Sequence, residues 1–248
     1  MTEGHRVIVI TGAGGSLGGA LSRQLAGEPA TDLVLSDISQ SSLDATLAGL
    51  PAPTGSVETV LADVSDIAQV EAVVARAVER HGHLDVLISN AGVVNPNGRI
   101  HNLTTQDWER AFSINLMGAV NGIRAAVPVM RAQRSGSIVL TASVAGLTAW
   151  SHAAPYCATK AAVISLAKVA AVEYARDGIR VNCVCPGTFV SAIHADLPEE
   201  AIDAMAARHP LGLGSPADLV GAFSYLASDA ARWTTGAALV VDGGYSAP

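Results

Sequence analysis

Residues 6–25 read RVIVITGAGGSLGGALSRQL, and this stretch decides the fold class of the chain. Arg6 to Ile10 are a short β-branched run, the pattern of a buried strand. A glycine-rich turn follows, and Leu17 to Leu25 have the spacing of an amphipathic helix. A strand, a glycine turn and a helix together predict the first unit of a nucleotide-binding βαβ fold, in which glycines admit a pyrophosphate and the helix N-terminus offers free N–H groups. Taken alone, the stretch is also compatible with a plain strand-to-helix turn.

The spacing of this turn matches neither of two common phosphate-binding motifs. Position 17 is Leu, so the turn is not G-x-G-x-x-G, and no Gly-Lys-Ser/Thr follows that would make it a P-loop.

Strand and helix patterns alternate from this unit to the end of the chain. We expect a single domain over residues 1–248, an α/β Rossmann-type fold with a doubly wound parallel sheet of about seven strands and helices on both faces. The predicted strands are 6–10, 32–36, 57–62, 85–89, 137–142, 179–185 and 237–241. The predicted helices are 17–25, 39–50, 66–81, 107–130, one around 156–177, 199–208 and 216–228.

Composition narrows the possible functions. Half of the residues are hydrophobic but only 4% are aromatic, so the core must be built from Ala, Val, Leu and Ile. The net charge of -7 argues against nucleic-acid binding. We see no uninterrupted apolar stretch of transmembrane length and no signal peptide, and the three cysteines lack a framework spacing, so we expect a cytoplasmic protein without a membrane anchor or a metal site.

Asp37 ends the second predicted strand, 19 residues after Gly18. An acidic side chain at this place accepts hydrogen bonds from the adenosine ribose and repels a 2′-phosphate, so it favours NAD over NADP. The alternative is a surface carboxylate that caps the next helix near Ser39.

Tyr156 and Lys160 lie four residues apart in the run PYCATKAAVISL, which has helical character. Residues at this spacing share one helix face. A cation beside a phenol lowers the pKa of the phenol from about 10, which makes Tyr156 a candidate general acid/base. Tyr-x-x-x-Lys also occurs often by chance, and only its combination with the other motifs gives it weight.

The chain as a whole resembles the short-chain dehydrogenase/reductase family, and the resemblance covers essentially the full length. Thr11-Gly12 to Gly18 are similar to the cofactor turn of the family, although Ser16 stands where the middle glycine is usual. The remaining matches are Asp63-Val64, Asn90-Ala91-Gly92, the tetrad of Asn115, Ser143, Tyr156 and Lys160, and Pro186-Gly187 followed by Ser191. Judged on its own, Asn115 in mid-helix would be expected to face solvent.

The resemblance implies hydride transfer between a nicotinamide and a secondary alcohol or ketone. Ser143 would bind the substrate oxygen, Tyr156 would exchange the proton, Lys160 would lower the tyrosine pKa and bind the nicotinamide ribose, and Asn115 would hold a water. The implied cofactor-binding residues are Gly12, Gly15, Ser16, Leu17, Gly18, Asp37, Ile38, Asp63, Val64, Asn90, Ala91, Gly92, Tyr156, Lys160, Pro186, Gly187, Phe189 and Ser191. Family members usually form tetramers through the long helices and the C-terminal segment, so the resemblance also implies a homotetramer.

The substrate should meet the carboxyl ends of the strands, under a lid at about 188–214. The substrate-binding residues are predicted to be Ser143, Ala145, Trp150 and Tyr156, and further walls are Val93, Val94, His152 and the segment from Phe189 to Met205. These walls predict a small to medium, largely apolar substrate, although Trp150 could equally pack at a subunit contact. Two alternatives stay open: a 3-oxoacyl-[acyl-carrier-protein] reductase, and a dinucleotide-binding scaffold without catalysis.

Overall fold

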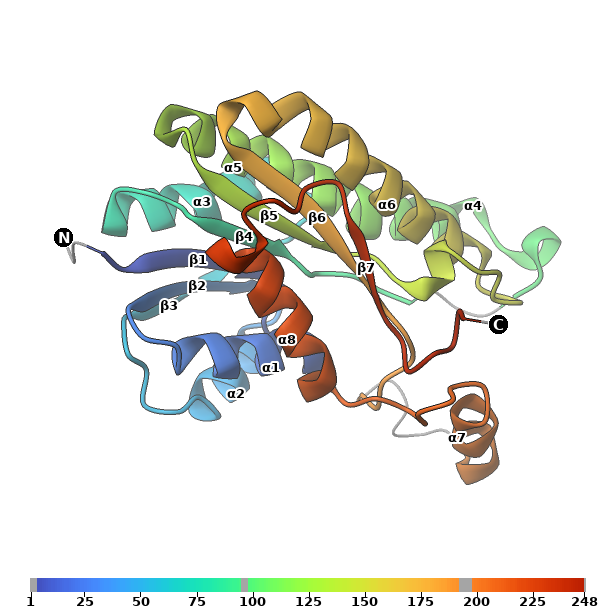
Figure 1. Ribbon diagram of the computed structural model, residues 1–248. Helices are drawn as coiled ribbons and strands as arrows, with labels where there is room; N and C mark the ends of the chain where they lie inside the picture. The colour runs from blue at the N-terminus through green and yellow to red at the C-terminus, as the bar shows by residue number, and fades with distance from the viewer. Residues whose placement is uncertain (1–3, 95–97, 192–197, 248) are drawn as a thin grey trace.

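A single parallel sheet of seven strands, in the order β3-β2-β1-β4-β5-β6-β7, organises the molecule. The computed structural model describes residues 4–94, 98–191 and 198–247 (Figure 1). The strands are β1 (Arg6–Thr11), β2 (Thr31–Asp37), β3 (Val57–Leu61), β4 (Val86–Ser89), β5 (Gly136–Thr141), β6 (Ile179–Pro186) and β7 (Ala238–Val241). The chain order reverses between β1 and β4, and ligands of such sheets bind at this point, beyond the carboxyl ends of the strands.

Helices cover both faces of the sheet, as predicted (Figure 1). One face carries α1 (Ser16–Ala26), α2 (Gln40–Ala48) and α8 (Pro216–Ala227), and the other carries α3 (Ile67–His81), α5 (Gly118–Gln133) and α6 (Ala154–Tyr174). Two more helices, α4 (Thr105–Ala111) and α7 (Glu199–Ala206), lie in connections, and α7 stands apart from both layers (Figure 1). Shorter turns are η1 (Ile100–Asn102), η2 (Phe112–Met117), η3 (Val144–Gly146), η4 (Ala175–Asp177) and η6 (Asp229–Ala231).

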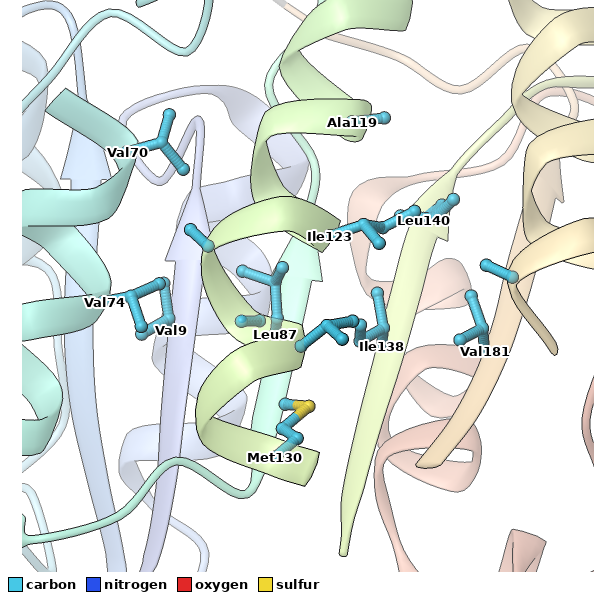
Figure 2. Packing of buried hydrophobic residues seen from close by; sticks show 14 of the residues in the cluster. Val9, Val70, Val74, Leu87, Ala119, Ile123, Met130, Ile138, Leu140 and Val181 are labelled. Atoms are coloured by element: carbon cyan, nitrogen blue, oxygen red, sulfur yellow. The ribbon is translucent and has the colours of Figure 1, made fainter. Parts of the chain in front are cut away.

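Alternation along the strands divides the core into two layers. In β1, Val7 and Val9 pack into the layer under α3, α5 and α6, whereas Ile8 and Ile10 pack into the layer under α1 and α8. Figure 2 shows the first layer, where side chains of α3 and α5 meet those of β1, β4, β5 and β6. Both layers consist mainly of Ala, Val, Leu and Ile, which confirms the expectation from the composition.

The predicted element boundaries differ from the observed ones in two instructive places. The helix expected over 107–130 is three pieces, because η2 is a π-helix turn between α4 and α5. Asp66, expected inside a helix, is instead the N-cap of α3, and its carboxylate accepts a hydrogen bond from the Ala68 N–H. An aspartate satisfies a free amide at that position, which is why it precedes the helix.

The helix at 154–177 (α6 with η4) is, among the described residues, the one segment long and apolar enough to cross a bilayer by length and composition. Charged residues of this helix include Lys160, Lys168 and Glu173. Val163, Ile164 and Ala167 of this helix pack into the core against the sheet, so its apolar character has a structural cause within the fold.

Candidate active site

A cleft of about 960 Å³ opens at the carboxyl ends of the strands. Its volume lies at the upper end of the range for ligand sites, about 300–1,000 Å³, so there is room for a dinucleotide and a small substrate. Of the predicted site residues, Asn115 and Ala145 do not line it. Those that do are Gly12, Gly15, Ser16, Leu17, Gly18, Asp37, Ile38, Asp63, Val64, Asn90, Ala91, Gly92, Ser143, Trp150, Tyr156, Lys160, Pro186, Gly187, Phe189 and Ser191.

The glycine turn is shaped by close backbone contacts. A Cβ atom on Gly18 would lie 2.0 Å from the Gly12 carbonyl oxygen, and one on Gly12 would lie 2.7 Å from Ala91 Cα. Gly15 is the N-cap of α1 and provides no side-chain cap, and a Cβ there would meet only one atom within 4 Å. The first amides of α1 therefore face the cleft with room beside them, which fits the phosphates of a dinucleotide.

Asp37 takes the capping role near Ser39 that was the alternative from the sequence, and it also supports the glycine turn. One carboxylate oxygen accepts from the Ser39 N–H at 3.0 Å, at the start of α2, and the other accepts from the Gly14 N–H at 2.9 Å. The carboxylate therefore fixes the glycine turn and still lines the cleft. Its negative charge at the end of β2 is placed to accept ribose hydroxyls and to repel a phosphate.

Asp63 and Val64 border the cleft after β3 through well-supported backbone. The Asp63 carboxylate accepts from the Ser65 N–H and hydroxyl, and the Val64 carbonyl accepts from the Asn121 amide at 2.9 Å. Gly118 lets α5 approach, because a Cβ there would lie 2.8 Å from Val64 Cγ2. This wall is thus held from the start of α5.

Asn90 braces the floor of the cleft. Its amide donates to the carbonyls of Thr11 and Gly12, and its oxygen accepts from the Thr141 hydroxyl at 3.3 Å. These bonds tie together the ends of β1, β4 and β5. Asn90 therefore holds the sheet edge and the glycine turn in register.

Tyr156 and Lys160 share one face of α6, as predicted. The Lys160 ammonium lies 5.7 Å from the centroid of the Tyr156 ring and donates to the Thr141 carbonyl at 2.7 Å. Lys160 is 4% exposed, and this burial lowers its pKa to about 8. An ammonium held between a backbone carbonyl and the cleft can bind hydroxyls there and place positive charge near the phenol.

In the protein by itself, the pKa of Tyr156 is shifted in the direction opposite to the lowering expected from a neighbouring cation. Burial raises the Tyr156 pKa above its usual value, and a hydrogen bond with Ser143 only partly offsets this. The physical reason is that the cleft wall removes water from the phenol, which disfavours the phenolate. The residues alone thus hold Tyr156 as a neutral proton donor.

Ser143 follows β5 as the N-cap of η3, and its hydroxyl oxygen accepts from the Ala145 N–H at 3.1 Å. Ala145 was predicted to contact the substrate, and this is wrong. It is fully buried in η3, so it orients Ser143 through its backbone and does not reach the cleft. The Ser143 hydroxyl, which can bind a substrate oxygen, and the Tyr156 phenol, which can donate a proton, thus lie at the same wall of the cleft.

Asn115 lies in the π-turn η2 and is buried, so the simple expectation of a solvent-facing side chain is wrong. Its amide oxygen accepts from the Val93 N–H at 2.8 Å, and its nitrogen donates to the Val93 carbonyl and to the Thr159 hydroxyl. A Cβ on Gly92 would lie 3.3 Å from the Asn115 oxygen and 3.4 Å from the Lys160 ammonium. The lack of a side chain at Gly92 thus keeps a space between the two polar groups.

The far end of the cleft contains residues that the sequence did not indicate. Trp150 touches Tyr156 on one side and Tyr245 on the other, with ring centroids 6.0 and 6.3 Å apart. Arg208 and His209 follow α7, and Tyr245 comes from the C-terminal segment. No local pattern marks them, because they meet only when the C-terminus folds back over the lid. Other lining residues without a sequence signal are Ala62, Arg110, Ile114, Thr141, Ser151, Ala153 and Thr188.

The two ends of the segment predicted as a lid, 188–214, pair with each other. Phe189 pairs with Gly214, and the Val190 N–H donates to the Gly214 carbonyl at 2.9 Å. Residues 192–197 of this segment lie outside the described residues. Of the further predicted walls, Val93, Val94 and Met205 line the cleft, but His152 is exposed outside it, in a left-handed turn with φ 68°.

Metal-ligating side chains do not gather anywhere in the part of the chain that the structure describes. Cys183 and Cys185 are buried in the same core layer, and all three cysteines are free thiols.

The comparisons with known proteins identify the family. The family model described as enoyl-(acyl carrier protein) reductase matches residues 12–246. The chain belongs to the short-chain dehydrogenase/reductase family. The chain is therefore an oxidoreductase of the kind that interconverts alcohols and ketones with a nicotinamide dinucleotide.

Three proteins similar to this chain carry names of different activities. The chain is 40% identical over 244 residues to cis-4-hydroxycyclohexanecarboxylate dehydrogenase of Sinomonas cyclohexanicum, covering 98% of this chain and 97% of the relative. It is 35% identical over 240 residues to 3-oxoacyl-[acyl-carrier-protein] reductase of Thermotoga maritima, covering 96% and 97%. The crystal structure of levodione reductase superposes with a TM-score of 0.91 at 35% identity and covers 98% of both chains.

Proposed function

We propose that this protein is an NAD-dependent dehydrogenase that oxidises a small cyclic secondary alcohol or reduces the matching ketone. The observation that carries the proposal is the meeting of Ser143, Tyr156 and Lys160 in the same cleft as the glycine turn. One of the relatives described above, cis-4-hydroxycyclohexanecarboxylate dehydrogenase, is named for a cyclohexane compound, which supports a cyclic substrate.

The residues divide the reaction among them. Ser143 binds the substrate oxygen and stabilises the charge that develops on it, and Tyr156 gives or takes the hydroxyl proton. Lys160 binds the nicotinamide ribose and keeps positive charge near the phenol. Asn115 faces Lys160 across the space that the missing side chain of Gly92 leaves open. When bound, the dinucleotide supplies the hydride-transfer chemistry and a positively charged ring.

The choice of NAD depends on Asp37. Its charge at the end of β2 opposes a 2′-phosphate, and none of the Lys or Arg side chains of the described residues lines the cleft next to it. We expect Asp37→Asn to raise the NADP-to-NAD ratio of kcat/KM by about 10- to 100-fold, as the loss of one charge repulsion of 1.4–3 kcal/mol implies.

Asn keeps the shape of the side chain and one oxygen, which can accept from only one of the Gly14 and Ser39 amides, so the variant removes the charge at the cost of one of these hydrogen bonds. Asp44→Asn, on the exposed part of α2, is the matched control. A wild type that already prefers NADP would contradict the assignment.

The decisive experiment is a turnover assay with NAD and NADP on a panel of cyclic and open-chain secondary alcohols, and with NADH on the ketones. We expect NAD-dependent oxidation of cyclic alcohols. Turnover of 3-oxoacyl thioesters in preference to all of these would favour the acyl-carrier-protein reductase, to which the relative from Thermotoga maritima lends support. The net charge of -7 speaks against docking that acidic carrier.

A dinucleotide-binding scaffold is the remaining alternative. It would bind NAD without turning over any member of the panel. The meeting of Ser143, Tyr156 and Lys160 in one cleft speaks against it, because a protein without catalysis has no need of a proton donor beside a hydroxyl that can bind a substrate oxygen.

We further propose a cytoplasmic homotetramer. Val169 and Val172 of α6 are 51% and 81% exposed on one helix face. Trp233, after η6, is 98% exposed, and Tyr225 of α8 and Val240 of β7 are also exposed. Two apolar patches on different elements suit two kinds of contact between copies, which is what a tetramer with two-fold axes requires. The three free cysteines suit a reducing compartment.

A further inference from the structure

We infer that the substrate carries a carboxylate and that Arg208 binds it at the far end of the cleft. This inference rests on the proposed function and narrows the expectation of a largely apolar substrate. It starts from a wall of rings that leads away from the reaction centre: Tyr156, then Trp150, then Tyr245. The guanidinium carbon of Arg208 lies 4.9 Å from the centroid of the Tyr245 ring and closes this wall.

Arg208 is held in place before any substrate arrives. Its Nη2 donates to the Tyr245 hydroxyl at 2.6 Å, and its plane lies over the Tyr245 ring. An arginine that is already oriented loses less conformational freedom when it pairs with a carboxylate.

The ring beneath Arg208 is anchored in turn by His209. The His209 and Tyr245 rings lie 4.8 Å apart. The Nδ1 of His209 is 2.8 Å from the Met205 carbonyl, and its Nε2 accepts from the Thr188 N–H at 3.1 Å. The guanidinium therefore belongs to a fixed group of side chains that joins the end of α7 to the C-terminal segment and to the loop after β6.

The guanidinium still has donors to offer. It carries five N–H groups, and the Tyr245 hydroxyl accepts only from Nη2. Among the described residues, no carboxylate forms a salt bridge with Arg208. A charged fork that faces the cleft and lacks a carboxylate partner within the described chain matches the geometry of a carboxylate.

The other charged groups of the cleft do not compete for this task. Asp37 and Asp63 line the part next to the glycine turn, and Lys160 is bonded to the Thr141 carbonyl beside Tyr156. Asp242 lies near His209. Its carboxylate already accepts hydrogen bonds from the amides of Gly244 and Ser246 and from the Ser246 hydroxyl. Arg110 reaches the cleft from α4 and has no aromatic ring to orient it in the described residues.

The implied substrate is a hydroxy acid with an apolar body between its two polar ends. The body would pack against Trp150, the carbinol would meet Ser143 and Tyr156, and the carboxylate would meet Arg208. On oxidation the carbinol hydroxyl would give its proton to the phenolate form of Tyr156 and the carbinol carbon would lose a hydride, for which bound NAD⁺ supplies the acceptor, while the carboxylate would keep all its bonds.

The test compares kcat/KM for 4-hydroxycyclohexanecarboxylate and for its uncharged carboxamide. A charge-assisted hydrogen bond is worth enough to give the wild type a preference for the acid of about 10- to 100-fold. Arg208→Met should remove most of this preference, mainly through the KM for the acid, and Arg208→Lys should keep part of it. Tyr245→Phe, which deletes only the hydroxyl that orients Arg208, should lower the preference by a smaller factor.

Arg110→Met is the matched control, because it removes a cation from the same cleft and should keep the acid-to-amide ratio. The inference is overturned if the wild type uses the amide as well as the acid, or if Arg110→Met lowers the ratio as much as Arg208→Met. These results would leave the dehydrogenase function standing.

If the wild type turns over no alcohol or ketone, the proposed function fails, and calorimetric binding of cyclohexanecarboxylate and cyclohexanecarboxamide then decides the inference. Tighter binding of the carboxylate that is lost in Arg208→Met supports a carboxylate site. Equal binding of the two compounds, or no binding of either, overturns it.

Discussion

A buried ammonium and a half-buried phenol one helical turn apart carry the chemistry that we propose for this chain. Each is shifted by burial toward its neutral form: the Tyr156 pKa is raised and the Lys160 pKa falls to about 8. A bound nicotinamide adds positive charge beside the phenol, so the pair reaches its working state only together with the cofactor.

Replacing Tyr156 with Phe tests the proton donor directly. A positioned general acid/base contributes about 10²- to 10⁴-fold, so kcat/KM should fall by that factor. NAD binding, measured by calorimetry, should persist because the ring and Lys160 remain. Tyr174→Phe, at the other end of α6, is the control, and retained activity in Tyr156→Phe would refute the assignment.

The lowered pKa of Lys160 predicts how the stability of the protein depends on pH. Its folded pKa of about 8 is below the ordinary value of 10.5, so between these two pH values the unfolded state binds more protons than the folded state. The free energy of unfolding of the wild type, relative to Lys160→Met, should therefore rise over this window by up to about 3 kcal/mol and be constant below pH 8.

Urea unfolding at several pH values measures this difference. Lys168→Met, which removes an exposed lysine from the same helix, is the matched control. A difference between wild type and Lys160→Met that stays flat from pH 8 to 10.5 would show that the lysine is not buried as described.

At the scale of elements, the π-turn η2 is the feature that brings Asn115 to the site. The wider turn allows a side chain in the middle of a long helical segment to bond the backbone of Val93 twice and Thr159 once. Such turns are rare and are often found at functional sites.

Asn115→Ala should lower the free energy of unfolding by about 1–3 kcal/mol, because it removes the hydrogen-bond partners of the partly buried N–H and carbonyl of Val93. It should also lower kcat, because the support behind Gly92 and Lys160 is lost. Thr159→Val removes only one partner, and its effects on urea unfolding and on kcat should be clearly smaller. Equal effects of the two variants would contradict the central place of Asn115.

At the scale of the whole molecule, apolar surface on α6 and near β7 predicts assembly. Val172→Glu places a charge on the more exposed of the two α6 valines, so sedimentation should show a species smaller than the tetramer of the wild type. Trp233→Glu should disrupt a different contact and also give a smaller species. Gln40→Glu, on exposed α2, is the control, and a monomeric wild type at micromolar concentration would contradict the proposal.

The amino-acid sequence by itself determined the alternation of strands and helices, the glycine turn, Asp37 at the end of β2 and the Tyr156–Lys160 pair. These features depend on residues close together in the chain, where periodicity and backbone freedom act locally. Tertiary structure alone decided that Ala145 is buried, that Asn115 turns inward from a π-helix, that burial raises the Tyr156 pKa, and that Tyr245 and Arg208 complete the cleft. Burial and desolvation depend on which distant segments pack together, and spacing along the chain does not contain that information.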